Sequence, residues 1–350
     1  MKNFIKLFTT FLLLGLVTAC LGGLGDSTTN SDSGGDSSDE TVVTGTQSTI
    51  YLGVQKDSST TAVFKFTFDS SDNSIQYTDD LTLTGYSDDV VRSTFFYDGN
   101  LYVGGRTSGN ASMVPVSHAD FSEGSLIDTV SSGSPKGYTH GLCFLSNGNF
   151  IIGGFTQEIN EHSDASTIVA SSDTQNVIKI NSLTRCAEGD STSELYGIDY
   201  DGNSDSDGDI IYLTKSGSDW SESERYDLSA LGGGSLFAMV KHTNGNLYAF
   251  PQNMGLPATK PIICSNISSL KLNSCIPSTG DDLGSGIIQT AVQIPGSDDM
   301  LFIDATSSSN VNLYRLDASA MTKTLVSELS GLGLVVRNQF GVRGMEIVAD

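Results

Sequence analysis

Proline, tryptophan and histidine are scarce in this chain of 350 residues, which has seven prolines, one tryptophan and four histidines. No histidine stands at metal-ligand spacing from another histidine or from a cysteine, which argues against a zinc site. Basic residues are also few, since 18 lysines and arginines stand against 41 acidic residues and the net charge is −23. Such a chain is repelled by nucleic acid, so we expect no nucleic-acid partner.

Several catalytic signatures are missing as well. The chain has no Gly-x-Ser-x-Gly elbow between a strand and a helix, the arrangement that presents a nucleophilic serine. Its glycine pairs stand in strand or turn contexts with no helix after them, which excludes phosphate loops of the Walker or dinucleotide type. After residue 20 no apolar run approaches the ~20 residues of a membrane span. These absences favour a protein without catalytic activity and leave the question of an enzyme open.

The first 20 residues read as an export signal. Lys2 and Lys6 make a basic start, an apolar run of ten follows at 8–17, and Val-Thr-Ala-Cys ends at Cys20. A basic start, a short apolar run and small residues at the cleavage point are the marks of a secretory signal. With the cysteine directly after them, they resemble the signal of bacterial lipoproteins. That resemblance implies lipidation of Cys20, which becomes the new N-terminus; the alternative is an ordinary signal with an incidental cysteine.

Three segments follow from this assignment: a signal peptide at 1–19, the lipidated cysteine with a tether at 20–47, and a domain at 48–350. The tether consists mostly of Gly, Ser, Thr and Asp, a composition that cannot bury enough apolar surface to fold. Leu21 follows the cysteine, and there is no aspartate at that position. By the same resemblance this implies the bacterial outer membrane, either its periplasmic face or the cell surface, with the membrane as a partner through the lipid.

From residue 48 on, the chain repeats a strand, a tight turn and a second strand. The clearest copies lie at 95–104, 143–153 and 240–249, with Asp-Gly or Asn-Gly at the turn, and looser copies lie at 197–213 and 292–303. Asn-Gly and Asp-Gly favour hairpins because both positions of the turn need a positive φ. A second unit, a short apolar–variable–apolar strand, recurs at 64–66, 114–116, 178–180, 226–228, 270–272 and 314–316.

The repeats predict an all-β fold, a β-propeller with six blades. Four-stranded units that recur every 40–50 residues are typical of propellers. The second strand of each hairpin begins near Ile50, Leu101, Phe150, Ile210, Leu247 and Leu301. The steps from Phe150 to Ile210 and on to Leu247 are uneven. We expect the strand at 344–350 to pair with the strand at 48–53 and close the ring. Five, seven or eight blades, an open solenoid and two sandwiches are the alternatives.

The segment Leu-Tyr-Arg-Leu-Asp at 313–317 resembles the repeats of a broad group of bacterial propellers. The resemblance covers 48–350 and is generic, since neither a Trp-Asp blade dipeptide nor a sialidase-type Asp box is present. It implies a fold and no particular activity, because one fold hosts many functions.

One acidic loop has the look of half a calcium site. Alternating oxygen side chains followed by Gly208 fit the first half of a calcium-binding loop, and the candidate ligands of Ca²⁺ are Asp201, Asn203, Asp205, Asp207 and Asp209. Thr214 stands where such a loop has its bidentate glutamate. An elongated polar hairpin turn is the alternative reading.

Four residues stand at equivalent positions just before the opening strands of their repeats. In a propeller that place faces the central funnel, which often binds ligands; the candidates are Arg92, His140, Tyr196 and Arg343. A solvated or hydrogen-bonded loop residue is the alternative for His140.

Four cysteines remain beyond Cys20, an even number that permits disulfides in an exported chain. Cys264 and Cys275 are close in sequence and share one hairpin-like segment, so we expect them to pair. Cys143 lies in an apolar opening strand and is expected to be a buried free thiol.

Two functions remain open at the level of the sequence. The first is a lipid-anchored envelope propeller that binds a protein, a glycan or a small ligand, or serves as a scaffold. The second is a propeller-type hydrolase or lactonase, with or without Ca²⁺, whose site lies in the central funnel.

Overall fold

The computed structural model describes residues 47–86, 91–107, 110–129, 139, 141–153, 159–172, 183–200, 208–228, 235–252 and 260–350. Within these ranges strands dominate, as the sequence predicts. The described helical elements are α1 (Ile267–Leu270) and the short 3-10 turns η2 (Lys271–Ser274) and η3 (Leu329–Leu332). None of the helices in the described part of the chain is long and apolar enough to cross a membrane.

The described strands form four sheets of four strands and one sheet of eight. The first sheet has the order β24 (Val342–Ala349), β1 (Gln47–Gln55), β2 (Thr61–Asp69), β3 (Ser74–Thr82). The second has the order β4 (Ser93–Tyr97), β5 (Asn100–Thr107), β6 (Asn110–Ser117), β7 (Ile127–Asp128).

The other two four-stranded sheets follow the eight-stranded one in the chain. Their orders are β16 (Ser235–Lys241), β17 (Leu247–Gln252), β18 (Ile262–Cys264), β19 (Cys275–Pro277), and β20 (Ala291–Gln293), β21 (Met300–Ser307), β22 (Asn310–Leu316), β23 (Lys323–Glu328). The eight-stranded sheet has the order β12 (Leu183–Glu188), β13 (Glu194–Tyr200), β14 (Gly208–Ser216), β15 (Asp219–Tyr226), β11 (Thr167–Ser172), β10 (Ile159–Asp164), β9 (Phe150–Gly153), β8 (Gly141–Phe144).

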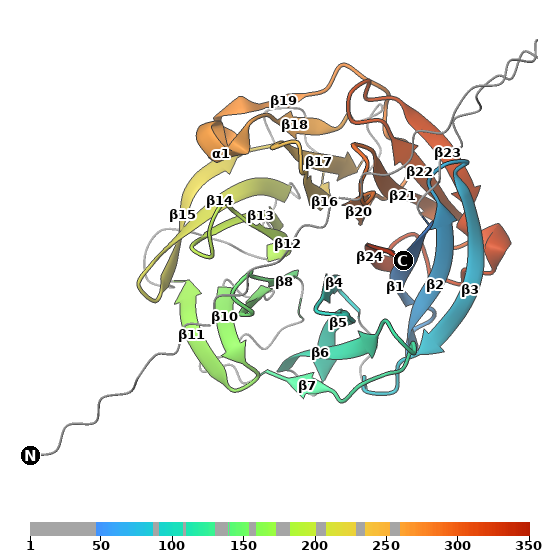
Figure 1. Ribbon diagram of the computed structural model, residues 1–350, viewed down its shortest axis with the longest axis horizontal. Helices are drawn as coiled ribbons and strands as arrows, with labels where there is room; N and C mark the ends of the chain where they lie inside the picture. The colour runs from blue at the N-terminus through green and yellow to red at the C-terminus, as the bar shows by residue number, and fades with distance from the viewer. Residues whose placement is uncertain are drawn as a thin grey trace, which may run out of the picture. The chain divides into compact units, whose positions relative to one another are not determined.

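The sheets stand around a common axis, as Figure 1 shows. The innermost strands contact one another in the order β24, β4, β8, β12, β16, β20 and back to β24. A closed ring of radially arranged antiparallel sheets is a β-propeller, so the predicted fold class is confirmed. The number of six blades stays a prediction, because one sheet joins two of the expected repeats.

Strand β24 closes the ring beside the first strand of the described chain. It pairs with β1 in antiparallel register, with Ile347 opposite Ile50 and Met345 opposite Leu52. The pairing of 344–350 with 48–53 is therefore confirmed. It removes the two open edges that a linear array of sheets would leave.

The eight-stranded sheet arises where two outer strands meet. Strands β11 and β15 pair in parallel at Ser171–Ser172. Close by, the fully buried carboxylate of Glu161 on β10 accepts hydrogen bonds from Trp220 Nε1 at 3.0 Å and Lys215 Nζ at 2.8 Å. A buried carboxylate needs such partners to offset its desolvation, so this ion pair fastens the two halves of the sheet to each other.

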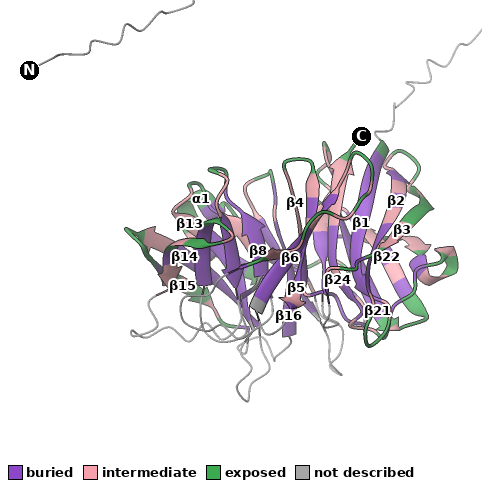
Figure 2. Ribbon diagram, turned by 90° about the horizontal axis from the view of Figure 1, so that it is seen from below, coloured by how far each residue is buried: buried purple, intermediate pink, exposed green. Residues whose placement is uncertain are grey.

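The core lies between the faces of neighbouring sheets. Figure 2 shows the buried residues along the inner strands and the exposed residues on outer strands and turns. Between the first and last sheets, Phe64 and Phe66 on β2 belong to the same buried cluster as Leu301 and Leu313. Strand β3, at the outer edge, is mostly exposed. This gradient from the axis outward follows from the alternation of apolar and polar residues along each strand.

The predicted tight turns are present. Gly99, Gly148 and Gly245 have φ angles of 75°, 87° and 85°, in the left-handed region where glycine carries no Cβ penalty. Each follows the Asp or Asn that the hairpin signal requires.

The fourth repeat is displaced by one strand from its predicted place. The hairpin expected at 197–213 consists of β13 and β14, which are the second and third strands of their half-sheet, and the innermost strand is β12. The equivalent second strand therefore begins near Leu195 instead of Ile210. With Leu195, the steps from Phe150 and to Leu247 become 45 and 52 residues, in place of 60 and 37. The steps were uneven in the sequence because Ile210 belongs to the third strand of its half-sheet and not to the second.

Two of the short strands predicted as a second unit are also corrected. Residues 270–272 lie at the junction of α1 and η2, and the third strand of that sheet is β18. Residues 226–228 lie at the end of β15, the fourth strand of its half-sheet. The segment predicted at 178–180 lies outside the described residues.

Candidate functional site

Two of the four funnel candidates meet at the axis. Arg92 lies directly before β4, and Arg343 is the second residue of β24, the neighbouring inner strand. Burial, followed by the positive charges of Arg92, Arg185 and Arg337, lowers the pKa of Arg343 to about 9. We call Arg92, Arg185, Arg337 and Arg343 the arginine cluster.

Arg185, on β12, bridges to two other blades. Its Nη2 donates hydrogen bonds to the backbone oxygen of Gln289 at 2.8 Å and to the backbone oxygen of Arg343. Gln289 directly precedes Thr290 and β20, so one guanidinium fixes the spacing of β12, β20 and β24. Burial lowers the pKa of Arg185 to about 10, and the negative charge of Glu346 opposes that shift.

Arg343 and Gln289 leave two donors without an acceptor. Arg343 Nη1 donates to Gln289 Oε1 at 3.1 Å. Among the described residues, the buried Nε of Arg343 and the buried Nε2 of Gln289 have no hydrogen-bond partner. We call these two nitrogens the donor pair. Because buried polar groups in folded proteins almost always have partners, we expect each of these two donors to have an acceptor that the described residues do not supply.

A cavity of about 270 Å³ lies at the axis next to Arg185. We call it the axial cavity. Its lining comes from β4, β8, β12, β16, β20 and β24 and from Thr290. Ten residues supply apolar or sulfur-containing surface, namely Phe95, Leu142, Cys186, Ala187, Met239, Val240, Ala291, Val292, Met345 and Ile347, and the polar ones are Thr94, Arg185, Lys241, Thr290, Gln293 and Glu346.

Glu346 is the one acidic residue in that lining. Burial raises the pKa of its carboxyl to about 8, against the opposing effects of Arg185 and of the hydrogen bond that Thr94 Oγ1 donates at 3.3 Å. A carboxyl with a pKa near neutrality is available both as an acid and as a base. Glu346 and Arg185 thus form one charged end of a cavity whose lining is partly polar and partly apolar.

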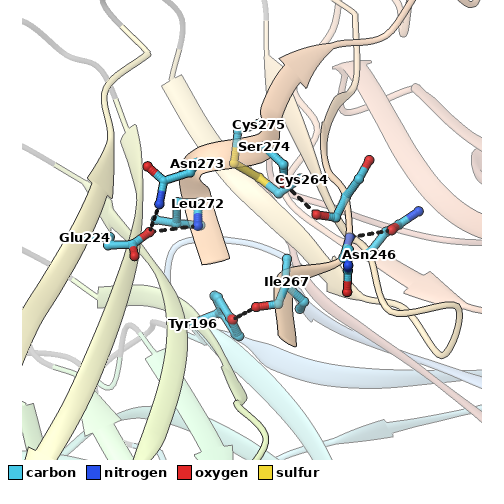
Figure 3. The surroundings of a disulfide bond; sticks show 11 residues. Tyr196, Glu224, Asn246, Cys264, Ile267, Leu272, Asn273, Ser274 and Cys275 are labelled. Atoms are coloured by element: carbon cyan, nitrogen blue, oxygen red, sulfur yellow. Dashed lines mark hydrogen bonds between the residues drawn. A yellow bond between two sulfur atoms is a disulfide. The ribbon is translucent and has the colours of Figure 1, made fainter. Parts of the chain in front are cut away.

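Tyr196 does not line the axis. Its side chain is fully buried, and its hydroxyl donates to the backbone oxygen of Ile267 at 2.9 Å (Figure 3). The reason is the displaced fourth repeat, since Tyr196 lies on β13, a second strand, and packs in the core against the sheet of β16. The innermost position of that repeat belongs to Arg185. His140 lies outside the described residues.

Only one of the proposed calcium ligands is among the described residues. Asp201, Asn203, Asp205 and Asp207 lie outside the described residues. Asp209 is described, and both of its carboxylate oxygens already have partners, Arg225 Nη1 at 2.5 Å and the backbone N–H of Leu228 at 3.2 Å. Among the described residues, no group of three or more His, Cys, Asp or Glu is placed to hold a metal. Calcium stays a prediction for this loop.

Both disulfides connect neighbouring strands. Cys264 and Cys275 pair across β18 and β19, as predicted (Figure 3). Cys143 is bonded to Cys186, so the expectation of a free thiol is wrong. The cause is again the position of β12, because as the inner strand after β8 it brings Cys186 beside Cys143. Cys20 lies outside the described residues.

Sequence reasoning missed three residues of the site, Arg185, Gln289 and Glu346. Arg185 was missed because the fourth repeat was displaced. Glu346 lies inside the closing strand, where the alternation of apolar and polar residues was visible but the direction of its side chain was not. Gln289 lies in a short connection before β20 without a motif of its own. One signal was available for Arg185, a lone basic residue in a chain with few bases.

Comparison with known proteins shows the fold alone. No protein-family model and no curated protein sequence matches this chain. Among solved structures, it is similar to the periplasmic gluconolactonase of Pseudomonas aeruginosa, with a TM-score of 0.55, 10% identity, 87% of this chain covered and 99% of the other. A second similar structure is a Bacteroides fragilis protein whose proposed activity is that of a 6-phosphogluconolactonase, with a TM-score of 0.52, 13% identity and coverages of 87% and 99%. Both confirm the propeller fold.

Proposed function

We propose that this protein is a lipid-anchored envelope propeller that binds a small organic anion at the arginine cluster. The observation that carries the proposal is the donor pair, two buried nitrogens that lack an acceptor among the described residues and belong to two residues hydrogen-bonded to each other. The proposed anchor is supported by the signal that ends at Cys20, and the proposed outer-membrane location is supported by Leu21 after it.

Charge supports an anion as the ligand. Burial, followed by the charges of three other arginines, lowers the pKa of Arg343. A carboxylate or phosphate among them would replace mutual repulsion by charge-assisted hydrogen bonds, which are about twice as strong as neutral ones. The guanidinium fork also matches the two oxygens of such a group in geometry. A small ligand is favoured because the site is enclosed by the ring of inner strands.

Binding is tested by titration calorimetry on the purified mature protein in detergent, with gluconate, 6-phosphogluconate and inorganic phosphate as probes. We expect saturable binding of at least one probe, weakened about tenfold or more by Arg343→Gln, because a lost charge-assisted bond is worth roughly 1.5–3 kcal/mol. Lys65→Gln, which removes one positive charge on β2, is the matched control and should bind like the unmutated protein. Equal affinity in the Arg343 and Lys65 variants would refute the proposed site.

A second candidate function is lactone hydrolysis, and Glu346 favours it. Its carboxyl exchanges protons near neutral pH and lies beside Arg185 at the axis. In this scheme the Glu346 carboxylate takes a proton from water as the oxygen adds to the lactone carbonyl carbon. The charge of Arg185 stabilises the resulting oxyanion, and the proton passes to the ring oxygen as its bond to the carbonyl carbon breaks. The names of the two similar structures agree with this chemistry.

The hydrolysis is tested with glucono-δ-lactone and 6-phosphogluconolactone, with spontaneous hydrolysis subtracted. If the protein is a lactonase, Glu346→Gln should lower kcat by about 10²–10⁴-fold, the usual contribution of general acid–base catalysis. Glu328→Gln, an exposed carboxyl at the end of β23, is the control and should keep full activity. Turnover that Glu346→Gln leaves unchanged would exclude this role for the residue, and turnover at the spontaneous rate would leave the binding function alone.

A further inference from the structure

The two residues of the donor pair lie at irregular points of the strand pairing, and Arg343 is the first of them. On β24, Val342 pairs with Val54 and Gly344 pairs with Gly53. Arg343 is therefore an extra residue in its strand, a β-bulge. A bulge re-aims a side chain, and it interrupts the ladder that would otherwise fix the backbone at that point.

Gln289 lies at a similar interruption before β20. Ile287 forms an isolated bridge with Ala305, and the next pairing along the chain is that of Ala291 with Phe302. Three residues of the inner segment therefore stand opposite two residues of β21. Both side chains of the donor pair thus extend from backbone that the regular pairing of strands leaves irregular.

One nitrogen of Arg185 binds the backbone of both residues. Its Nη2 donates to the backbone oxygen of Gln289 at 2.8 Å and to the backbone oxygen of Arg343. Among the described strands, β20 and β24 are the innermost of their sheets and have a partner strand in the sheet on one side only. The guanidinium therefore holds these two backbones together from the side of the axis.

This hold crosses the ring of inner strands. In the order of their contacts, β12 is two places from β20 and three places from β24, so β12 and β24 lie on opposite sides of the axis (Figure 1). Cys186, the residue after Arg185, is bonded to Cys143 of β8. Arg185 thus extends from a strand with a covalent tie to its neighbour and reaches the two irregular segments across the axis.

We propose that Arg185 is the positioning residue of the donor pair, and that it sets the spacing of Arg343 Nε and Gln289 Nε2 without contacting the ligand. This role rests on the proposed anion function. Hydrogen bonds weaken steeply when their distance and angle are poor, and a binding site needs its groups within about 0.5 Å of the productive geometry. A guanidinium suits the task because its donors form a rigid fork, whereas lysine carries a point charge on a flexible stem.

The first test compares crystals of the mature parent and of Arg185→Lys, both without ligand. The lysine keeps the positive charge and loses the planar fork. We expect the backbone oxygens of Gln289 and Arg343 to shift relative to each other by more than about 0.5 Å. Arg185→Gln is a second variant with the same expected shift, and melting curves establish that each variant is folded. Oxygens that keep their parent spacing in a folded variant would overturn the proposal.

The second test is titration of the same proteins with gluconate, 6-phosphogluconate and inorganic phosphate. Arg185→Lys should weaken binding about tenfold or more, because two donors lose their alignment although the charge of the arginine cluster is unchanged. An unchanged affinity would mean that Arg185 contributes charge and not position. A parent that binds none of the probes would refute the anion site, and the crystals would still decide on the role of Arg185.

Arg315→Lys is the matched control for stability. Arg315, on β22, also joins two sheets, since its Nη1 donates to the backbone oxygen of Ser70 at 2.9 Å. The variant should lower the melting temperature and leave the affinity for the probes unchanged. An equal loss of affinity in Arg315→Lys and Arg185→Lys would show a general effect of stability and would contradict a positioning role for Arg185.

Discussion

At the scale of single residues, the axis concentrates charged groups that are costly to bury. Arg343 and Arg185 have lowered pKa values and Glu346 a raised one, and burial is the first cause in each case. Ionisable groups with shifted pKa values that lie close together are typical of functional sites. Contacts elsewhere offset the cost of burying these charges, such as the hydrogen bonds from Arg185 to the backbone of two other blades.

Glu346 makes stability depend on pH in a defined direction. Between the ordinary pKa of 4.5 and the folded value of about 8, the folded protein holds a proton that the unfolded chain has lost. The free energy of unfolding should therefore fall as pH rises through this window, by up to about 1.4 kcal/mol per pH unit from this group. Below pH 4.5 the group has no effect on the slope.

The measurement is the melting temperature of the unmutated protein and of Glu346→Gln at pH 5, 6, 7 and 8. The difference between the two should change steadily in favour of the variant as the pH rises, because glutamine does not titrate. Parallel curves for the two proteins would show that Glu346 is ionised in the folded state.

At the scale of elements, the two disulfides do different work. Cys264–Cys275 closes a segment of 11 positions within one sheet, and Cys143–Cys186 closes 43 positions and joins the inner strands β8 and β12. The second bond lies next to the axial cavity, which Cys186 helps to line. It fixes the distance between β8 and β12, the innermost strands of the third and fourth repeats.

Removing the longer disulfide should destabilise more than removing the shorter one. In the chain-entropy model the loss is about 4 kcal/mol for Cys143→Ser with Cys186→Ser, and about 3 kcal/mol for Cys264→Ser with Cys275→Ser. Urea unfolding of the two double variants, each beside the oxidised parent, measures both values. The reverse order of stabilities would mean that the unfolded-state argument does not govern these bonds.

Which elements the sequence could predict follows from how local their signals are. The hairpins at Gly99, Gly148 and Gly245 and the closing strand were predictable, because a turn signal or a strand pattern identifies each locally. The third strand β18 was not, because only three residues pair there and the apolar pattern at 270–272 continues into a helical turn. Arg185 fell outside the predicted site because its blade has a long second hairpin, β13–β14, that imitates the opening one.

At the scale of the whole molecule, an acidic chain surrounds a basic axis. The net charge is −23, while three arginines of the cluster lie on or beside the inner strands β4, β12 and β24. A negative exterior slows the approach of anions, and salt screens that repulsion. The closed ring keeps these arginines close together despite the repulsion between their own positive charges.

Ring closure should be needed for folding as a whole. Deleting residues 342–350 removes β24 and leaves β1 without its inner neighbour and the ring without one of its inner strands. We expect the deletion to abolish the cooperative thermal transition and to make the chain sensitive to limited proteolysis. Asp350→Ala, which loses the hydrogen bond from Thr49 Oγ1 but keeps β24, is the control and should melt within a few degrees of the parent. A cooperative transition in the deletion variant would contradict a role for closure.

Because β24 lies at the C-terminal end of the chain, the proposed site is complete only after this last strand has been synthesised. Thr94 and Glu346 touch at the axis but are 252 positions apart. While the chain is being made or exported, the blades that form first stand beside a gap, and neither the arginine cluster nor the axial cavity has its last wall. A chain that ends before residue 346 therefore lacks one wall of the proposed site. Binding of a ligand at the proposed site would therefore show that the chain extends past residue 346.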